Sequence, residues 1–267
     1  MNRLPSVSLC ISTYNFPEAL ELCLMSILRQ TQMPLEIIIG DDGSTTKTKE
    51  LIDSYRPKFS LPIKHVWHPD DGFKLAEIRN KSFAATTGEY IIQIDGDIVL
   101  NPFFIEDHAR FAKPNTFVAG TRSMLNQAST AEIFATRNID SIDKLKIEKR
   151  YNTYRILPMS YVMYKIQKGP SQAKFVLGAN MAFWKESIIK VNGYDENYKG
   201  WGKEDHDLSI RLINAGYQLH FLKFAAVIYH LYHKSASEGN IDKNLPLIQR
   251  VIQEKTFFTA NGVNKYL

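Results

Sequence analysis

Asp95 and Asp97 are two carboxylates separated only by a glycine, and they follow the apolar run at residues 90–94. In an extended segment, residues two positions apart face the same side, and Gly96 has no side chain to keep a ligand away. Carboxylate oxygens suit Mg²⁺ and Mn²⁺, which in proteins also keep waters and bind substrate phosphates. The triplet therefore predicts a divalent cation that is held together with a nucleotide diphosphate.

Two more polar clusters follow predicted strands. They are Ser12, Thr13, Tyr14 and Asn15 after the first strand, and Asp41, Asp42, Gly43 and Ser44 after the second. Each cluster alone also suits a turn or a helix cap. In open α/β sheets, however, ligands bind at the carboxyl ends of the strands. Three such clusters at one sheet edge favour a binding site.

Trp201 lies between two glycines and precedes Glu204 and Asp205 at a predicted helix start. Acids are stabilising at any helix N-terminus, so the charges alone do not require a function. That explanation leaves the tryptophan unexplained, and a flexible loop with an aromatic platform suits a sugar ring. Lys203 is interpreted as a solvated charge, with neutralisation of a leaving group as the alternative.

His230 and His233 follow the apolar segment at residues 224–229, where a ligand-binding edge is expected. Imidazole suits Mn²⁺ as a protein ligand beside a carboxylate. We expect His230 to be the ligand that accompanies Asp97, with His233 as the alternative.

The elements that would position these residues alternate between strand and helix. Strands are predicted at 7–12, 35–40, 63–67 and 90–95, and helices at 17–30, 46–55 and 75–86. Farther on, the pattern predicts a strand at 175–183, helices at 184–191 and 204–215, and strands near residues 219 and 227. This alternation predicts an α/β fold with a mostly parallel sheet flanked by helices.

The whole chain, residues 1–267, is expected to form one domain. Residues 1–100 would be its nucleotide-binding half and 101–235 its acceptor and catalytic half. The second half contains a basic, tyrosine-rich, helical-looking insertion at about 121–175, which is expected to shape the acceptor site. The insertion is either an ordinary helical lid or an amphipathic surface that docks on an anionic leaflet. Residues 236–267 would form a helical tail.

The composition excludes several classes of protein. With 44% hydrophobic and 23% charged residues, the chain is neither disordered, collagenous nor a coiled coil. Its apolar runs are far shorter than the ~20 residues of a membrane-spanning helix. The net charge of +5 is spread among 28 acids and no recognition motif is present, so nucleic-acid binding is not expected.

The sequence also bears on the compartment. The start of the chain lacks a long apolar region followed by a small-residue cleavage site, so secretion is not expected. Cys10 and Cys23 both lie in apolar stretches and cannot form a disulfide framework. A reducing, cytoplasmic location is expected, with peripheral attachment to the inner membrane face as a further expectation.

The ordered elements STYN, EIIIGDDGS, EIRNKSFAATTGEYIIQIDGD, GANMAFWKE, NGYDENYKGWGKEDHDL and VIYHLYH resemble those of family-2 glycosyltransferases with the GT-A fold. The resemblance spans residues 6–233. It is closest to the branch with bacterial chondroitin polymerase domains, and the WGxED element is shared with β-1,4-galactosyltransferases.

The resemblance implies an inverting, metal-dependent transfer of a hexose or N-acetylhexosamine from a UDP-sugar. The acceptor would be a hydroxyl of a glycan or lipid-linked molecule in surface polysaccharide or lipopolysaccharide synthesis. The implied donor-binding residues are Ser12, Thr13, Tyr14, Asn15, Asp41, Asp42, Arg79, Asn80, Asp95, Gly96 and Trp201. Asp97 and His230 would bind Mn²⁺ or Mg²⁺. Asp205 would be the catalytic base, with Glu204 beside it.

Other enzyme classes fit less well. The segment after the first strand reads STYNFP, which is not the glycine-rich fingerprint of a dehydrogenase, and no Walker motif is present. A sugar nucleotidyltransferase would begin with a glycine-rich, basic triphosphate loop, so it is a distant alternative. A non-catalytic module that binds sugar nucleotides or glycans is the other alternative, although such a module would have no need of the base Asp205.

Overall fold

A computed structural model describes residues 3–234 and 241–267 of the chain. Its strands are β1 (Val7–Thr13), β2 (Glu36–Asp41), β3 (Ile63–Trp67), β4 (Tyr90–Asp95), β5 (Ile98–Leu100), β6 (Thr116–Gly120), β7 (Ser123–Leu125), β8 (Ile147–Glu148), β9 (Asn180–Trp184), β10 (Gln218–Leu222) and β11 (Ile228–His230). Its α-helices are α1 (Pro17–Ile27), α2 (Thr46–Tyr55), α3 (Leu75–Ala84), α4 (Phe104–Phe111), α5 (Gln127–Thr136), α6 (Leu157–Ile166), α7 (Lys185–Val191), α8 (Glu204–Asn214) and α9 (Ile241–Glu254).

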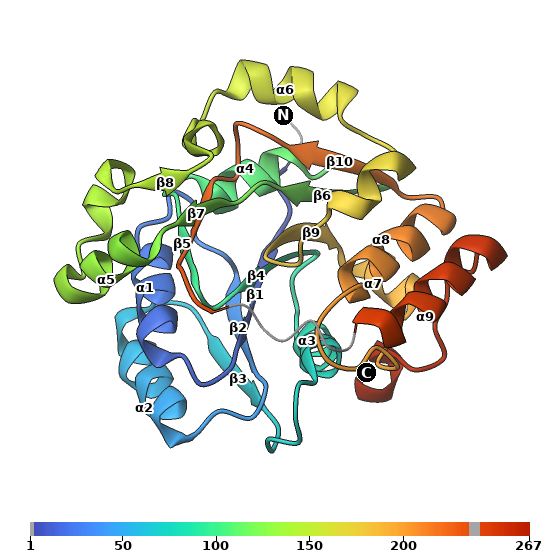
Figure 1. Cartoon of the computed structure of the whole chain (residues 1–267), viewed down its shortest axis with the longest axis horizontal. Helices are drawn as coiled ribbons and strands as arrows, with labels where there is room; N and C mark the ends of the chain where they lie inside the picture. Colours follow the sequence, from blue (N-terminus) through green and yellow to red (C-terminus); the bar gives the residue numbers. More distant parts are fainter. Residues whose placement is uncertain (1–2, 235–240) are drawn as a thin grey trace.

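The central sheet has seven strands in the order β10-β6-β9-β4-β1-β2-β3. Strand β9 is antiparallel to both of its neighbours, and the other pairs are parallel. The predicted α/β architecture with a mostly parallel sheet is therefore confirmed (Figure 1).

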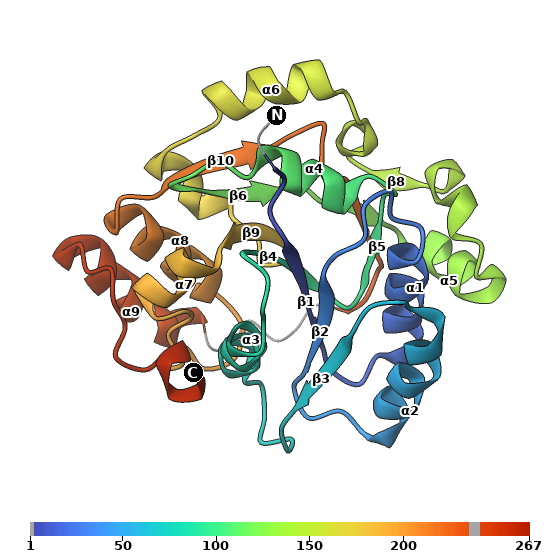
Figure 2. The same cartoon turned by 180° about the vertical axis from the view of Figure 1, so that it is seen from behind.

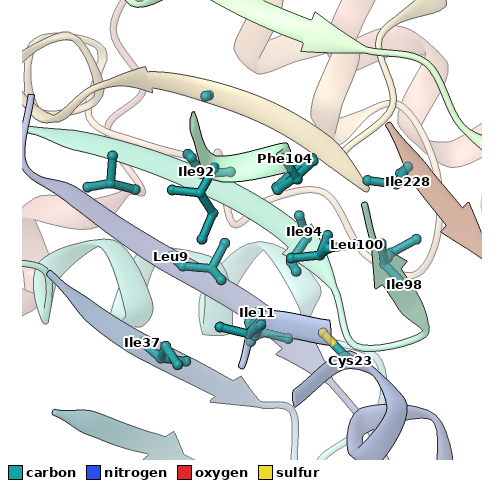
Figure 3. Close-up of a cluster of buried hydrophobic side chains, with 14 of the residues drawn as sticks. Leu9, Ile11, Cys23, Ile37, Ile92, Ile94, Ile98, Leu100, Phe104 and Ile228 are labelled. Atoms are coloured by element: carbon teal, nitrogen blue, oxygen red, sulfur yellow. The ribbon is translucent and has the colours of Figure 1, made fainter. Parts of the chain in front are cut away.

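Side chains that alternate along the buried strands separate into two cores. Leu9 and Ile11 of β1 pack with α1, α2 and α4 on one face, and the free thiol of Cys23 lies in this layer (Figure 3). Cys10 points to the other face, which α3, α7 and α8 cover. Because both faces are buried, the central strands are mostly apolar on both sides, as is typical of parallel sheets. The prediction of two small, buried thiols is confirmed.

The insertion at 121–175 is less helical than its sequence suggested. It contains α5 and α6 but also β7 and β8, which form a second sheet in the order β5-β11-β7-β8. These strands are two or three residues long, too short for a periodic pattern to reveal them. The second sheet matters for the site because β5 directly follows the Asp95–Asp97 triplet and pairs with β11, which ends at His230.

The register of the central sheet gathers the polar strand ends. Ser12 lies opposite Asp95 on one side and Gly40 on the other, and Thr13 lies opposite Asp41. All three clusters therefore meet at one edge, below the centre of the view in Figure 2, which shows the same fold from behind. In the part of the chain that the structure describes, no helix is long and apolar enough to cross a membrane.

Candidate active site

A recess of about 400 Å³ opens at this edge of the sheet. Several elements contribute to its lining, which consists of Ser12, Thr13, Tyr14, Phe16, Asp42, Phe73, Leu75, Asp95, Gly96, Asp97, Arg122, Met124, Trp201, His230 and His233. Polar strand ends, a loop aromatic and two histidines thus share one space. The recess is polar around the Asp95–Asp97 triplet and apolar near Phe16, Phe73 and Leu75.

Asp97, His230 and His233 form a cluster whose ligand atoms all lie within 4.8 Å of one another. Asp97 Oδ2 lies 3.0 Å from His233 Nε2 and 3.6 Å from His230 Nε2. The pairing of β5 with β11 brings His230 opposite Ile98, beside Asp97. Each histidine donates Nδ1–H to a backbone carbonyl, of Leu231 and of Lys234 respectively, at 2.8 Å. The Nε2 atoms of both rings are thereby directed at the carboxylate.

The cluster fits a divalent cation. Asp97 Oδ1 is buried and has no hydrogen-bond partner among the described residues. An unpartnered buried carboxylate oxygen is costly unless something binds it. One carboxylate and two imidazole nitrogens are a donor set that suits Mn²⁺. The sequence left His230 and His233 as alternatives, and the structure brings both to Asp97.

The titration behaviour of the cluster agrees with a cation site. The hydrogen bond to Asp97 raises the pKa of His233 to about 9. Burial opposes ionisation of Asp97, but its hydrogen bond with His233 and the charges of both histidines lower its pKa below the usual value. The site thus favours a positive charge beside Asp97, and a metal ion would have to displace the proton of His233.

The ends of β1 and β2 divide into residues that face the recess and residues that support it. Ser12, Thr13, Tyr14 and Asp42 face it. Asn15 does not, because its side chain accepts a hydrogen bond from the Thr45 backbone N–H at 2.9 Å and fixes the turn.

Asp41 is 1% exposed and also lies outside the recess. Its carboxylate accepts hydrogen bonds from His65 Nε2 at 2.9 Å and from the backbone N–H of Ser44 at 2.8 Å. Asp42 Oδ1 in turn accepts one from His68 Nε2 at 2.7 Å. Neither histidine was predicted to belong to the site, although the strand at 63–67 was predicted correctly. Strand β3 contains His65, and His68 directly follows its last residue.

The resemblance implied that Arg79 and Asn80 contact the nucleotide. In the structure both lie beneath the recess and do not line it. Arg79 is 2% exposed, and its guanidinium pairs with Asp205 at 2.8 Å and with Asp95 at 3.1 Å. Asn80 is fully buried, and its side chain donates to the backbone carbonyl of Tyr194 at 2.9 Å. Helix α3 turns both side chains inward, toward buried partners.

Asp205 is held by three donors. Its Oδ1 accepts hydrogen bonds from Arg79 Nη1 and Tyr194 Oη, both at 2.8 Å, and its Oδ2 accepts one from the backbone N–H of Gly178 at 2.8 Å. A Cβ at position 178 would lie 2.5 Å from Asp205 Oδ1, so any larger residue than Gly178 would displace this carboxylate or shift the loop. The carboxylate is therefore fixed in orientation next to the recess, although it does not line it.

Glu204 precedes Asp205 at the start of α8 and is 5% exposed. Burial, together with the adjacent charge of Asp205, raises the pKa of Glu204 to about 7. Its Oε2 accepts a hydrogen bond from the backbone N–H of Gly202 at 3.0 Å, which ties it to the loop that carries Trp201. Both acids of this pair thus lie near the recess.

Trp201 lines the recess and is 41% exposed, which suits a platform for a ring that stacks on it. Its loop is held from outside by α9, where Asn244 Nδ2 donates to the carbonyl of Gly202 at 2.9 Å. Lys203 has a left-handed backbone with φ of 79° and does not line the recess.

Arg122 is the only lysine or arginine among the described residues that line the recess. It lies two residues after the end of β6. Polar residues after strands were the candidates for the site, so a prediction of β6 would have included Arg122 among them. A guanidinium in this position can neutralise an anionic ligand.

The comparisons with known proteins agree with this geometry. The family model described as Glycosyl transferase family 2 matches residues 8–191. The chain belongs to this family. A second model, described as the N-terminal domain of galactosyltransferase, matches residues 158–234, which include Trp201 and both clustered histidines. The protein is therefore a transferase, and the binding-module and nucleotidyltransferase alternatives are not supported.

Similar proteins include polysaccharide synthases. The chain is 25% identical to the hyaluronan synthase of Pasteurella multocida, over 79% of this chain and 23% of that protein. It is 23% identical to the chondroitin synthase of Escherichia coli, over 84% of this chain and 34% of that protein. The chain thus spans a quarter to a third of the length of these two relatives.

Similar solved structures share the GT-A fold. A mannosyltransferase from Pyrobaculum calidifontis in complex with GDP-Man and Mn²⁺ has a TM-score of 0.61 at 17% identity, covering 94% of this chain and 64% of that chain. S. aureus TarS 1-349 in complex with UDP has a TM-score of 0.65 at 16% identity, covering 97% of this chain and 68% of that chain.

Proposed function

We propose that this glycosyltransferase moves a hexose or N-acetylhexosamine from a UDP-sugar to a hydroxyl of a glycan or lipid-linked acceptor, with inversion at the anomeric carbon. The product would belong to a surface polysaccharide or lipopolysaccharide. The observation that carries the proposal is the cluster of Asp97, His230 and His233 in the same recess as the polar strand ends. Similarity to hyaluronan and chondroitin synthases supports a glycan product.

In this proposal residues 1–100 form the nucleotide-binding half and 101–235 the acceptor and catalytic half of one domain. Ser12, Tyr14 and Asp42 contact the nucleotide, and the hydrogen bond from His68 fixes the orientation of Asp42. UDP is proposed as the nucleotide because of the resemblance to UDP-sugar enzymes, and it is the nucleotide with which TarS was solved, whereas the Pyrobaculum mannosyltransferase was solved with GDP-Man.

Displacement at the anomeric carbon requires that the acceptor hydroxyl lose its proton and that the departing diphosphate be stabilised. In this proposal Asp205 takes the proton. Three hydrogen bonds fix the orientation of its carboxylate, and because Oδ2 accepts only one of them, this oxygen can still accept a proton. Arg122 neutralises the diphosphate, in place of Lys203 or the enclosed Arg79. A divalent cation held by Asp97, His230 and His233 would supply further stabilisation of that charge.

The test is thermal stability of the protein with UDP-, GDP-, dTDP- and cytidine-monophosphate-linked sugars, with and without Mn²⁺. A ligand that binds only the native state raises the melting temperature. We expect a UDP-sugar to do so, and only in the presence of the metal. A shift with a GDP-sugar alone would correct the donor, and the absence of a shift with any nucleotide sugar would contradict the proposed function.

A further inference from the structure

Helix α6 exposes apolar side chains on its outer face. Met159, Val162 and Ile166 lie on one stripe, at positions i, i+3 and i+7, and are 41%, 55% and 64% exposed. Ser160 and Tyr164 lie on the opposite face and are buried. A surface helix of a globular protein normally turns its apolar stripe inward. An outward stripe therefore indicates a surface that something else covers.

The residues around α6 extend this surface with large amphipathic side chains. Those that are roughly half exposed are Tyr151, Tyr154, Tyr161 and Phe175. Tyrosine has an apolar ring and a polar tip, and it is enriched where an apolar phase meets water. We call residues 149–175 the α6 surface.

The excess positive charge of the protein is concentrated in the α6 surface. Residues 149–174 contain six lysines and arginines and no acid, and the rest of the chain has 27 lysines and arginines against 28 acids. Lys165 and Lys168 are exposed next to the apolar stripe. Arg155 is paired with Asp107 at 2.7 Å, so five of the six cations remain without an ion-pair partner among the described residues. The surface thus combines apolar side chains with an excess of positive charge, and its complement is an apolar phase bordered by negative charge.

The α6 surface is separate from the active site. No residue of α6 lines the recess at the ends of β1 and β4. In both views α6 is the outermost element at one end of the molecule (Figures 1 and 2). Its apolar stripe therefore is not explained by donor binding or catalysis.

We propose that the α6 surface binds a lipid bilayer that contains anionic lipid. The helix lies in the plane of the interface, with Met159, Val162 and Ile166 among the acyl-chain boundary and Lys165 and Lys168 at the lipid phosphates. A second copy of this chain fits less well as the occupant, because a two-fold contact would bring two like-charged surfaces together. The proposal goes beyond the proposed function, since it needs neither nucleotide nor metal.

The test is co-sedimentation of the full chain with vesicles of phosphatidylcholine, either pure or with one third phosphatidylglycerol. We expect binding to the anionic vesicles only, and weaker binding as salt increases. The double variants Val162→Ser/Ile166→Ser and Lys165→Glu/Lys168→Glu should each lower the affinity by ~10-fold or more, given the contribution expected from each residue at the interface. The matched controls Ile252→Ser and Lys47→Glu, on exposed positions of α9 and α2, should bind as the parent does.

Equal binding to both kinds of vesicle, or binding to neither, would overturn the proposal. So would a concentration-dependent dimer in sedimentation velocity that Val162→Ser/Ile166→Ser disperses, because the surface would then be an interface between copies. The melting shift with a UDP-sugar is measured on the same variants and should be unchanged. A failure of the proposed function would appear in that shift, whereas a failure of this inference would appear only with vesicles.

Discussion

Tyr194 Oη donates a hydrogen bond of 2.8 Å to Asp205 Oδ1 from a fully buried position. The same hydroxyl accepts a hydrogen bond from Gln93 Nε2 at 2.9 Å, and Gln93 Oε1 lies 3.1 Å away as a second acceptor. The contact with Asp205 is shorter and its acceptor is a carboxylate, which favours donation of the hydroxyl hydrogen to Asp205. Gln93 Nε2 also donates to the carbonyl of Gly178 at 2.8 Å, and the backbone N–H of Gly178 binds Asp205 Oδ2. Tyr194 is therefore a positioning residue for the proposed base, and it reaches that base through the protein interior.

Replacing Tyr194 by phenylalanine should lower kcat by ~10-fold and leave the KM for the donor unchanged, because one hydrogen bond that orients Asp205 is lost. Steady-state kinetics with the donor found in the melting screen measures both constants. The variant should also lose about 1 kcal/mol of stability, measured by urea unfolding.

Tyr198→Phe is the matched control. Tyr198 is also buried, and its hydroxyl donates to Asp207, two residues after the base, at 3.3 Å. It should lose comparable stability without a change in kcat. If both variants lowered kcat equally, the Tyr194 effect would be structural and the positioning role would be wrong.

Asp205→Asn should reduce transfer by ~10² or more while sparing donor binding, as expected for loss of a general base. Single-turnover kinetics together with the melting shift separates the two effects. Glu204→Gln is the companion variant, because the pKa of Glu204 is raised to about 7 and suits a base at neutral pH. A larger loss of transfer in Glu204→Gln than in Asp205→Asn would assign the base to Glu204.

The cation site makes a separate prediction. Asp97→Ala should abolish the enhancement of UDP-sugar binding by Mn²⁺, and His230→Ala and His233→Ala should each weaken Mn²⁺ binding by at least ~10-fold. Calorimetric titration with Mn²⁺ measures this without requiring turnover. Asp53→Ala removes an exposed acid of α2 and should have no effect. If His233→Ala bound Mn²⁺ as the parent does, the ligand set would be Asp97 and His230 alone.

Several parts of the site follow from the sequence because local rules determine them. The apolar runs of β1, β2 and β4 are long enough to identify, and the polar residues after them must share one edge of a parallel sheet. Asp97 and Asp42 were located in this way. The division between Asp42, which faces the recess, and Asp41, which lies behind it, depends on side-chain direction at the strand end. Periodicity does not specify that direction.

Other parts depend on contacts between residues far apart in the chain. Arg79 and Asp205 are 126 positions apart, and their ion pair depends on how α3 and α8 pack. Arg122 was missed because β6 was not predicted, and β5, β7 and β8 of the second sheet were missed because they are too short to show a pattern. The insertion at 121–175 is therefore the region where the sequence was least informative about the site.

Arg122→Ala should raise the KM for the donor and lower kcat, together reducing kcat/KM by ~10²-fold. The reason is that a guanidinium beside the diphosphate stabilises its charge both in the bound donor and in the transition state. The melting shift with UDP alone should also decrease, which tests binding without turnover. Arg110→Ala, on the exposed side of α4, is the control and should behave as the parent. An unchanged kcat/KM in Arg122→Ala would remove this residue from the site.

Glu204 should make stability depend on pH in a defined direction. Its pKa is raised from 4.5 to about 7, so between these values the folded protein retains a proton that the unfolded chain has released. Stability therefore falls as pH rises through this interval, by up to about 3 kcal/mol above the folded pKa. Glu204→Gln cannot ionise, so it should be more stable than the parent at about pH 8 and similar to it at about pH 5. Urea unfolding at the two pH values measures this, with Glu50→Gln on exposed α2 as the control. Destabilisation by Glu204→Gln to the same extent at both pH values would show that the ionised carboxylate is not costly in the folded protein.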